Sequence, residues 1–170
     1  MEHPLHLHHG AMRRPDWVAG AVAGLVGGAV LMVLELLWTA ATNDAGPWRS
    51  SQLVAALVLG PEVTHGSGHV FALKIVAVAL ATHYALGVLF GIVLGAVATW
   101  LNLERDLWRM AAIGAAFGAL LYLLDFHGMA LRFPWIVEMR GAATLFAHIV
   151  FGTTAALLYR RFARTPEPPA

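Results

Sequence analysis

The sequence predicts an all-α integral membrane protein, folded as a bundle of four transmembrane helices. Hydrophobic residues make up 59% of its 170 residues and charged residues only 12%, about half the charged share of a soluble domain. Four apolar stretches approach or exceed the roughly 20 residues that a helix needs to cross a bilayer. Lipid can cover the side chains of such helices while their backbone hydrogen bonds are satisfied internally. The lipid bilayer is therefore the first expected partner.

The composition also excludes several classes of function. The net charge of +1 leaves no basic arm for nucleic acid. The chain has no cysteine, and so it has no disulfide framework, thiolate metal site or cysteine nucleophile. Its first apolar stretch is not followed by an Ala-x-Ala cleavage site, which favours a retained span over a signal peptide. The sequence has no nucleophile-plus-base grouping or phosphate-binding loop, so an enzyme activity would depend on a metal or haem.

Three elements precede the second span. Residues 1–16 are expected to form a disordered, His-rich cytoplasmic tail, with a weak surface metal site as the alternative. The first span is predicted over 17–42, with Trp17 and Trp38 at the two membrane interfaces. The apolar stretch 48–59 is too short to cross. We expect it to form an interfacial or re-entrant helix.

Three further spans complete the transmembrane domain, which we place at 17–161. The second span is long enough to tilt or to project beyond the bilayer. A charged turn follows it, a polar loop precedes the fourth span, and the Pro-rich residues 162–170 form a second disordered tail. The predicted second, third and fourth spans are 71–101, 110–127 and 141–159.

The distribution of positive charge predicts the topology. Cytoplasmic loops of membrane proteins carry an excess of Lys and Arg. With both termini in the cytoplasm, the inner segments hold seven of the eleven Lys and Arg residues, and each inner segment contributes to the excess. We therefore predict that both termini are cytoplasmic. The seven residues are Arg13, Arg14, Arg105, Arg109, Arg160, Arg161 and Arg164.

Glycines recur at helical spacing in three of the predicted spans. Such stripes let helix backbones approach closely in lipid, where no hydrophobic force draws helices together. Each stripe lies mainly in the cytoplasmic half of its span, so we expect tight packing there and wider separation in the outer half. Unused glycine faces leave room for a homodimer or a larger membrane complex. The stripes are Gly20, Gly24 and Gly28; Gly87, Gly91 and Gly95; and Gly114 and Gly118.

The same order of features occurs twice. Each half of the chain has an acid near the end of one span, a Pro-Trp pair in the loop, and a histidine four residues before a glycine in the next span. This order indicates two duplicated helix pairs related by a pseudo-two-fold axis along the membrane normal. The residues are Glu35, Pro47, Trp48, His83 and Gly87 in the first half, and Asp125, Pro134, Trp135, His148 and Gly152 in the second.

Glu35, Asp125, His83 and His148 are the candidate site residues. All four fall in the outer half of the predicted bundle. A charged side chain at the centre of a span is unfavourable by about 2.5–3.5 kcal/mol, so we expect these groups to face one another. Two imidazoles and two carboxylates suit a divalent transition metal. Glu and His within spans also mark proton paths.

Five other residues have expected structural or gating roles. Arg140 is predicted to pair with Asp125 or to anchor the chain at the interface. The two loop tryptophans are expected to belong to the aromatic belts of the membrane surface. The glycines that follow the two histidines are expected to bring their helices close to a neighbour. These four residues are Trp48, Trp135, Gly87 and Gly152.

Three segments and three single residues of the chain are similar to those of a known group of membrane proteins. They are GPWRSSQLVAALVLG (46–60), YLLDFHGMALRFPW (122–135) and HIVFGTTAALLYR (148–160), together with Glu35, His83 and Arg140. In these features the chain resembles short, four-span bacterial inner-membrane proteins, some of which are labelled sodium:proline symporters. The resemblance covers about residues 17–161, and it implies a multi-pass protein of the bacterial inner membrane without implying an activity. The chain departs from the pattern at Asp125, where an amide is more usual, which argues against an obligatory charged ligand there.

Three functions stay open for the predicted site. The first is a Glu/His site that binds a metal ion or relays protons in a small inner-membrane protein. One form of this hypothesis makes the protein an accessory subunit of a larger membrane complex. The second is a membrane-embedded haem b protein with His83 and His148 as axial ligands, in which nearby glycines admit the ring and Tyr84 and Phe146 line it. The third is a structural or assembly protein whose polar cluster only sets helix register.

Overall fold

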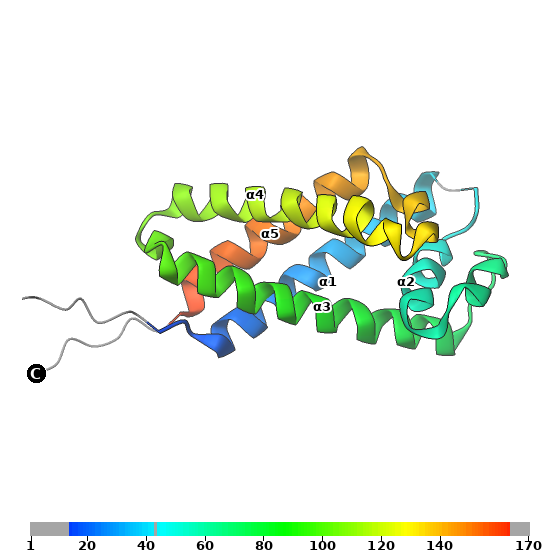
Figure 1. The fold of residues 1–170 in the computed structure, drawn as a ribbon, viewed down its shortest axis with the longest axis horizontal. Helices are drawn as coiled ribbons and strands as arrows, with labels where there is room; N and C mark the ends of the chain where they lie inside the picture. Colours follow the sequence, from blue (N-terminus) through cyan, green and yellow to red (C-terminus); the bar gives the residue numbers. More distant parts are fainter. Residues whose placement is uncertain (1–13, 43, 164–170) are drawn as a thin grey trace, which may run out of the picture.

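Four long helices run side by side along the molecule (Figure 1). The computed structural model describes residues 14–42 and 44–163, and these contain helices and no β-strand. Four helices are long and apolar enough to cross a membrane, one of them together with the turns that extend it to Leu131. The predicted all-α membrane bundle is therefore confirmed. The four helices are α1 (Trp17–Thr42), α3 (Leu73–Trp100), α4 (Leu107–Leu123) and α5 (Ala142–Phe162).

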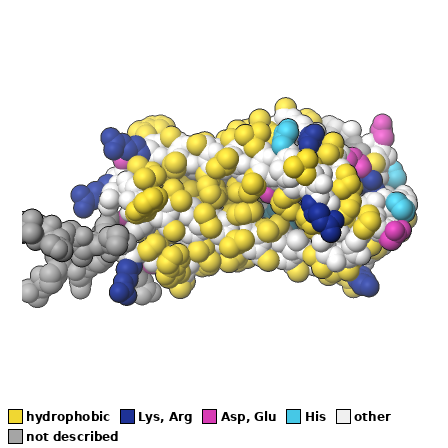
Figure 2. Space-filling model, viewed as in Figure 1, with side chains coloured by type: hydrophobic (Ala, Val, Ile, Leu, Met, Phe, Trp, Pro, Cys, Tyr) yellow, Lys and Arg dark blue, Asp and Glu magenta, His cyan; other side chains and the backbone are white. Residues whose placement is uncertain are grey.

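The exposed side chains of the bundle are those of a lipid-facing surface. Hydrophobic side chains cover its middle, and Lys and Arg gather at its two ends (Figure 2). Trp17, Trp38, Trp100 and Trp108 are each more than half exposed. Trp17 and Trp38 are separated along α1 by about 32 Å at the rise of an α-helix, close to the hydrocarbon thickness of about 30 Å. This spacing fits the predicted interface positions of both residues.

The start of the third span differs from its prediction for a local reason. Oδ1 of Asp106 accepts hydrogen bonds from the backbone N–H groups of Trp108 and Arg109, at 2.9 and 3.1 Å. This cap satisfies two free N–H groups of the first turn, so α4 begins at Leu107 rather than at residue 110. The predicted tail residues 1–13, with their histidines, and 164–170 lie outside the described residues.

Glycines bring α1 and α3 into backbone contact. A methyl group added at Gly24 would collide with the carbonyl group of Gly87, and one added at Gly91 would collide with Gly20 and Gly24. Close approach of this kind is the usual role of small residues in membrane helices. The predicted stripes therefore meet each other within one helix pair.

The pair α4 and α5 repeats this contact. A methyl group at Gly114 would collide with the carbonyl group of Gly152, and one at Gly118 with the backbone of His148. Gly114 precedes Asp125 by 11 residues, as Gly24 precedes Glu35, and Gly152 follows His148 as Gly87 follows His83. Residues that are equivalent in the predicted duplication therefore make equivalent contacts. The symmetry does not extend further, because α5 packs along α1 whereas α4 scarcely touches α3.

The glycines of the four spans all pack against other residues of the same chain. Every glycine of α1, α3, α4 and α5 has atoms of the same chain within 4 Å of the place where a Cβ would lie. The expectation that unused glycine faces leave room for a homodimer is therefore wrong, although the homodimer itself stays a prediction.

The end of the bundle where α1 begins and α5 ends, here called the terminal end, has a dense core. Leu94, Ala98, Met110 and Tyr159 are almost completely buried there. A hydrogen-bond chain crosses this core, in which the backbone N–H of Asp16 donates to the Tyr159 hydroxyl at 3.1 Å and that hydroxyl lies 2.7 Å from Thr99 Oγ1. Thr99 in turn donates to Glu104 Oε1 at 2.6 Å. These bonds join the ends of three spans and were not predicted from the sequence.

Short helices close the opposite end, here called the capped end. The predicted helix over 48–59 is present as α2 (Arg49–Leu59), followed by η1 (Pro61–His65). The third span continues past Leu123 into a π-helical turn, and the loop after it is folded into two further 3-10 turns instead of an open loop. These elements are η3 (Leu124–Gly128), η4 (Met129–Leu131) and η5 (Pro134–Met139). Together with α2 they lie where the spans separate (Figure 1).

The glycine contacts predict opposite effects for two substitutions in the same stripe. Gly24→Ala places a methyl group against the Gly87 carbonyl, and overpacking of this kind costs about 1–3 kcal/mol. Gly28→Ala meets its nearest atom, His83 Nε2, at 3.6 Å, and it gains helix propensity. We expect a lower thermal midpoint in detergent for Gly24→Ala and an unchanged or higher one for Gly28→Ala. Equal midpoints for the two variants would contradict the packing described here.

Candidate functional site

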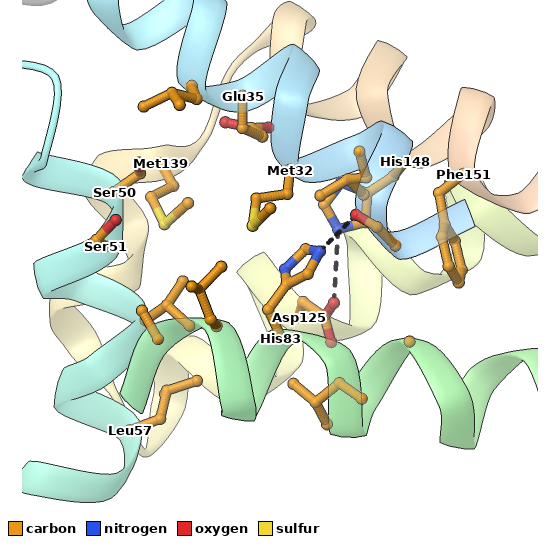
Figure 3. Close-up of a pocket in the computed structure, with 18 of the residues that line it drawn as sticks. Met32, Glu35, Ser50, Ser51, Leu57, His83, Asp125, Met139, His148 and Phe151 are labelled. Atoms are coloured by element: carbon orange, nitrogen blue, oxygen red, sulfur yellow. Dashed lines mark hydrogen bonds and ion pairs between the residues drawn. The ribbon is translucent and has the colours of Figure 1, made fainter. Parts of the chain in front are cut away.

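The structure brings the four candidate residues to one cavity at the capped end. Glu35 on α1, His83 on α3, Asp125 on η3 and His148 on α5 all line a cavity of about 350 Å³ (Figure 3). The cavity lies where the spans have separated beyond their glycine contacts, and α2 and η5 contribute to its wall. Most of the other lining side chains are apolar.

His148 occupies the centre of the polar group. Its Nδ1 donates to the carbonyl of Thr144 at 2.8 Å, because a carbonyl oxygen can only accept. This bond fixes the ring and leaves Nε2 directed at Asp125, 3.7 Å from Oδ2 (Figure 3). The rings of Tyr122 and Phe126 pack edge-on against the imidazole. His148 is 8% exposed, so little solvent reaches this pair.

Glu35 and His83 also interact electrostatically with His148. The Glu35 carboxyl group interacts with the side chain of Thr144 as well. Its Oε1 is buried and has no hydrogen-bond partner among the described residues. Glu35 thus brings an unused acceptor into the cavity. Thr144, which serves both Glu35 and His148, was missed from the sequence, although its position four residues before His148 placed it on the same helix face.

His83 is held by the helix that it packs against. Its Nε2 donates to the carbonyl of Gly28 at 2.8 Å, and its ring packs edge-on against Tyr84. The ring packs directly against the backbone of residue 28, where a Cβ would lie 3.6 Å from Nε2, in ordinary van der Waals contact. In the neutral ring Nδ1 is then an acceptor.

The geometry does not close a metal site. No three His, Asp or Glu side chains of residues 14–42 and 44–163 gather closely enough to hold one ion. Each histidine has one nitrogen bound to a backbone carbonyl, which leaves a single nitrogen free on each ring. The predicted metal set of Glu35, Asp125, His83 and His148 therefore shares a cavity but does not converge on a point.

The arrangement is also unfavourable for haem. Gly87 and Gly152 were expected to leave space for the ring, but the backbones of α1 and α4 occupy the space beside them. Phe146, expected to line the haem, is 61% exposed on the outside of the bundle. His83 would have to release its bond to Gly28 to offer Nε2 to iron. These contacts remove the space on which the haem prediction relied.

Arg140 does not use Asp125 as its partner. Its Nε donates to the carbonyl of Phe126 at 2.6 Å. Phe126 is in the π-helical turn η3, directly after Asp125. Arg140 therefore acts on the backbone that positions Asp125, and the carboxylate of Asp125 is left to His148. The predicted Arg140–Asp125 pair is replaced by this contact.

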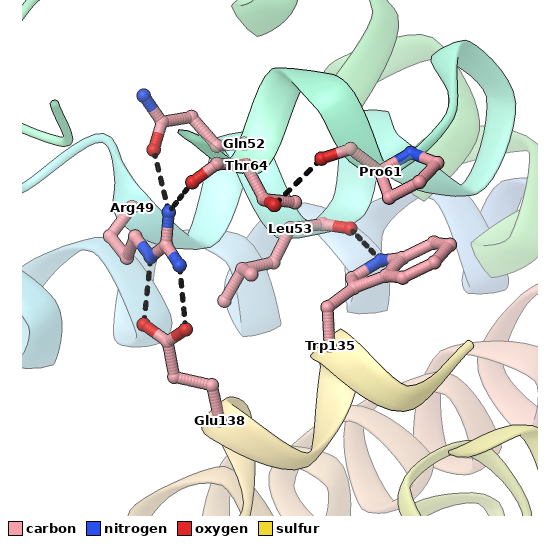
Figure 4. A network of polar contacts seen from close by, with 7 residues as sticks. All are labelled: Arg49, Gln52, Leu53, Pro61, Thr64, Trp135 and Glu138. Carbon is pink, nitrogen blue, oxygen red and sulfur yellow. Dashed lines mark hydrogen bonds and ion pairs between the residues drawn. The ribbon is translucent and has the colours of Figure 1, made fainter. Parts of the chain in front are cut away.

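A salt bridge fastens α2 over the cavity. Nε and Nη2 of Arg49 donate to the two carboxylate oxygens of Glu138, each at 2.7 Å, and Nη1 bonds the side chain of Gln52 and the carbonyl of Thr64 (Figure 4). This pair was not predicted from the sequence, because its members are far apart in the chain. Hydrogen bonding to the Arg49 guanidinium lowers the pKa of Glu138. The salt bridge ties α2 to η5.

The two loop tryptophans also belong to this closure. Trp135 donates from Nε1 to the carbonyl of Leu53 at 3.2 Å (Figure 4). Trp48 packs edge-on against Phe71 with ring centroids 5.0 Å apart, and it lines the cavity. Both side chains are partly buried. They hold the cap in place in addition to any interfacial role.

The cavity reaches the apolar flank of the bundle. Its lining includes Val76, Leu80 and Phe90 of α3 and Phe126 and Met129 of η3 and η4. The helices α3 and α4 make few contacts with each other, and an acidic side chain is visible between hydrophobic ones on this face (Figure 2). A ligand can therefore approach from the side that lipid would cover.

Comparison of the chain with protein-family models, with curated proteins and with solved structures finds no match. The resemblance to four-span bacterial proteins stays a prediction, and the chemistry of the site has to be argued from its own geometry.

The Arg49–Glu138 salt bridge predicts that low pH loosens the attachment of α2 to η5. The lowered pKa of Glu138 means that its stabilisation is complete above the ordinary value of 4.5 and is lost as the pH falls through the lower, folded value. The Glu138 side chain is 42% exposed, so the contribution is at most about 1 kcal/mol. Amide hydrogen exchange of α2, corrected for its intrinsic pH dependence, should accelerate below about pH 4.5 in the wild type.

Two variants check the assignment of this acid effect. Glu138→Gln should exchange faster at neutral pH and lose the acid step. Glu62→Gln is the matched control, because Glu62 is exposed and pairs only with His65. An acid step that persists unchanged in Glu138→Gln would assign it to another group.

Proposed function

We propose that this chain is a small multi-pass protein of the bacterial inner membrane that reversibly binds protons at Glu35, His148 and Asp125. The observation that carries the proposal is the position of His148. Its Nδ1 is committed to the Thr144 carbonyl, and its free Nε2 faces the Asp125 carboxylate 3.7 Å away. Glu35 interacts with the same ring.

This arrangement suits proton transfer because one nitrogen serves two carboxyl groups. A neutral His148 has an acceptor at Nε2, which can take a proton, and the resulting imidazolium is stabilised by either carboxylate. Imidazole is the side chain whose charge changes most readily near neutral pH. A membrane interior penalises isolated charge, so protonation of one group depends on the state of the others.

Protons are a better occupant than a metal ion for this geometry. A proton needs one nitrogen and one oxygen at a time, whereas a metal site needs several ligands directed at one point. The separation of the His and acidic groups supports the first requirement and not the second. Glu35 Oε1, buried without a partner, is an acceptor that a proton would satisfy.

The packing supports a proton-binding site rather than a continuous proton path. Beyond the cavity the terminal half of the bundle is closed by the glycine contacts and by the core around Leu94, Met110 and Tyr159. A proton that enters at the capped end therefore stays in that half unless the helices move. Proton binding coupled to a second event fits this closure better than passive conduction.

Charge supports an orientation with the termini in the cytoplasm. Five described Lys or Arg residues lie at the terminal end and four at the capped end. This excess follows the rule for cytoplasmic segments. The cavity would then open in the outer half of the membrane. The five residues are Arg14, Arg105, Arg109, Arg160 and Arg161.

Infrared difference spectroscopy during a pH titration tests the proposal, because a protonated carboxyl group has its own carbonyl band. We expect Glu35→Gln to remove one such band and Asp125→Asn to remove another. In His148→Gln the remaining carboxyl bands should titrate at a different pH, because the charge that couples to them is gone. Glu62→Gln, at the exposed surface, should leave these bands unchanged.

The contrary result is equally clear. If the spectra of Glu35→Gln and Asp125→Asn match that of the wild type over the whole titration, the cluster binds no protons. The polar residues would then serve only to set helix register.

A further inference from the structure

Once Glu35 is ionised, every unoccupied polar group of the candidate residues in the cavity is a hydrogen-bond acceptor. The bond from His83 Nε2 to Gly28 leaves Nδ1 as the acceptor of a neutral ring, whereas His148 Nε2 already faces the Asp125 carboxylate at 3.7 Å. Glu35 Oε1 is buried and unpartnered. An occupant that offers donors would satisfy groups that are otherwise left unpaired.

The charge of the cavity has one sign. Two carboxyl groups line it, whereas no Lys or Arg does. An anionic head group, such as a carboxylate or a phosphate, would meet like charge and no charged donor. A cation would meet opposite charge, and the lining ring of Trp48 can add a cation–π contact.

The rest of the cavity selects a hydrophobic body. Apart from the four candidate residues and two serines, Ser50 and Ser51, the wall is made of aliphatic, aromatic and Met side chains and of glycine. A volume of about 350 Å³ lies at the small end of the range for drug-sized ligands. The flank between α3 and η3 gives access from the lipid side.

We propose that this cavity binds a hydrophobic ammonium cation, which donates its N–H groups to Glu35 and to the neighbouring acceptors. The ligand enters between α3 and η3, and its apolar body lies among the Met and aromatic side chains. The inference rests on the proposed proton site, because cation and proton compete for the same carboxylate. When the ammonium binds, Glu35 gives up its proton to solvent, so the net charge of the site changes little.

Three pyrene derivatives with different head groups test this proposal. Pyrenemethylammonium is the cation, pyrenemethanol is a neutral donor, and pyrenecarboxylate is the anion. Binding to the full chain in nanodiscs is measured by energy transfer from tryptophan to pyrene, with Trp48 at the cavity wall, and empty nanodiscs with a soluble indole measure partitioning into lipid. We expect saturable transfer for the cation, at least about tenfold tighter than for the other two.

Two further readouts do not depend on a variant. Binding of the cation in weak buffer should release protons, and its affinity should fall as the pH is lowered. Glu35→Gln should weaken cation binding by about tenfold or more, whereas Glu62→Gln should not alter it. Circular dichroism confirms that each variant is folded.

The results separate this inference from the proposed function. Carboxyl bands that titrate as proposed, together with equal binding of the three pyrene probes, would overturn the cation site and leave proton binding intact. Cation binding that is unaffected by Glu35→Gln would also overturn it. An absence of titrating carboxyl bands would remove both proposals.

Discussion

The close contact between glycine backbones determines where this protein can have a cavity. The helices of each pair approach more closely than a larger residue would allow. Gly24 contacts Gly87 between α1 and α3, and Gly114 contacts Gly152 between α4 and α5. Helices in lipid have no hydrophobic force to hold them together, so these contacts fix the terminal half of the bundle. Beyond them the spans separate, and the space between them is filled by the short helices of the cap and by the cavity that they enclose. The site is thus a consequence of where the glycines stop.

In each histidine of the site, one ring nitrogen is hydrogen-bonded to a backbone carbonyl. The carbonyl of Gly28 accepts from His83 and that of Thr144 accepts from His148. Both rings are therefore oriented before any ligand binds, with Nδ1 of His83 left as an acceptor and Nε2 of His148 directed at Asp125. A backbone carbonyl also helps to position Asp125, because Arg140 donates a hydrogen bond to the carbonyl of the next residue, Phe126. Orientation by backbone carbonyls leaves the carboxyl groups, to which we assign proton binding, facing the cavity.

The sequence predicted the spans and the grouping of the site, and the reasons for its failures are physical. Composition and glycine spacing identify four membrane helices, and the penalty for charge in lipid is enough to predict that Glu35, Asp125, His83 and His148 share one interior. The partners of those residues depend on angles that spacing does not give. Arg140 lies near Asp125 in the chain, yet it bonds a backbone carbonyl, and Arg49 finds Glu138 across the cap. Only a folded cap brings such residues together.

The two halves of the chain use equivalent residues differently, which gives the site its character. In the second half the acid and the histidine pair, as Asp125 and His148. In the first half His83 instead bonds the carbonyl of Gly28, and Glu35 interacts with Thr144 and His148 of the other helix pair. Asp125 lies on a π-helical turn, a distortion that is frequent at functional sites, whereas Glu35 lies within the regular helix α1. Had both halves paired internally, every acid would have its own imidazole and no acceptor would be left over. The departure from symmetry is what leaves Glu35 with an unpartnered oxygen at the wall of an apolar cavity.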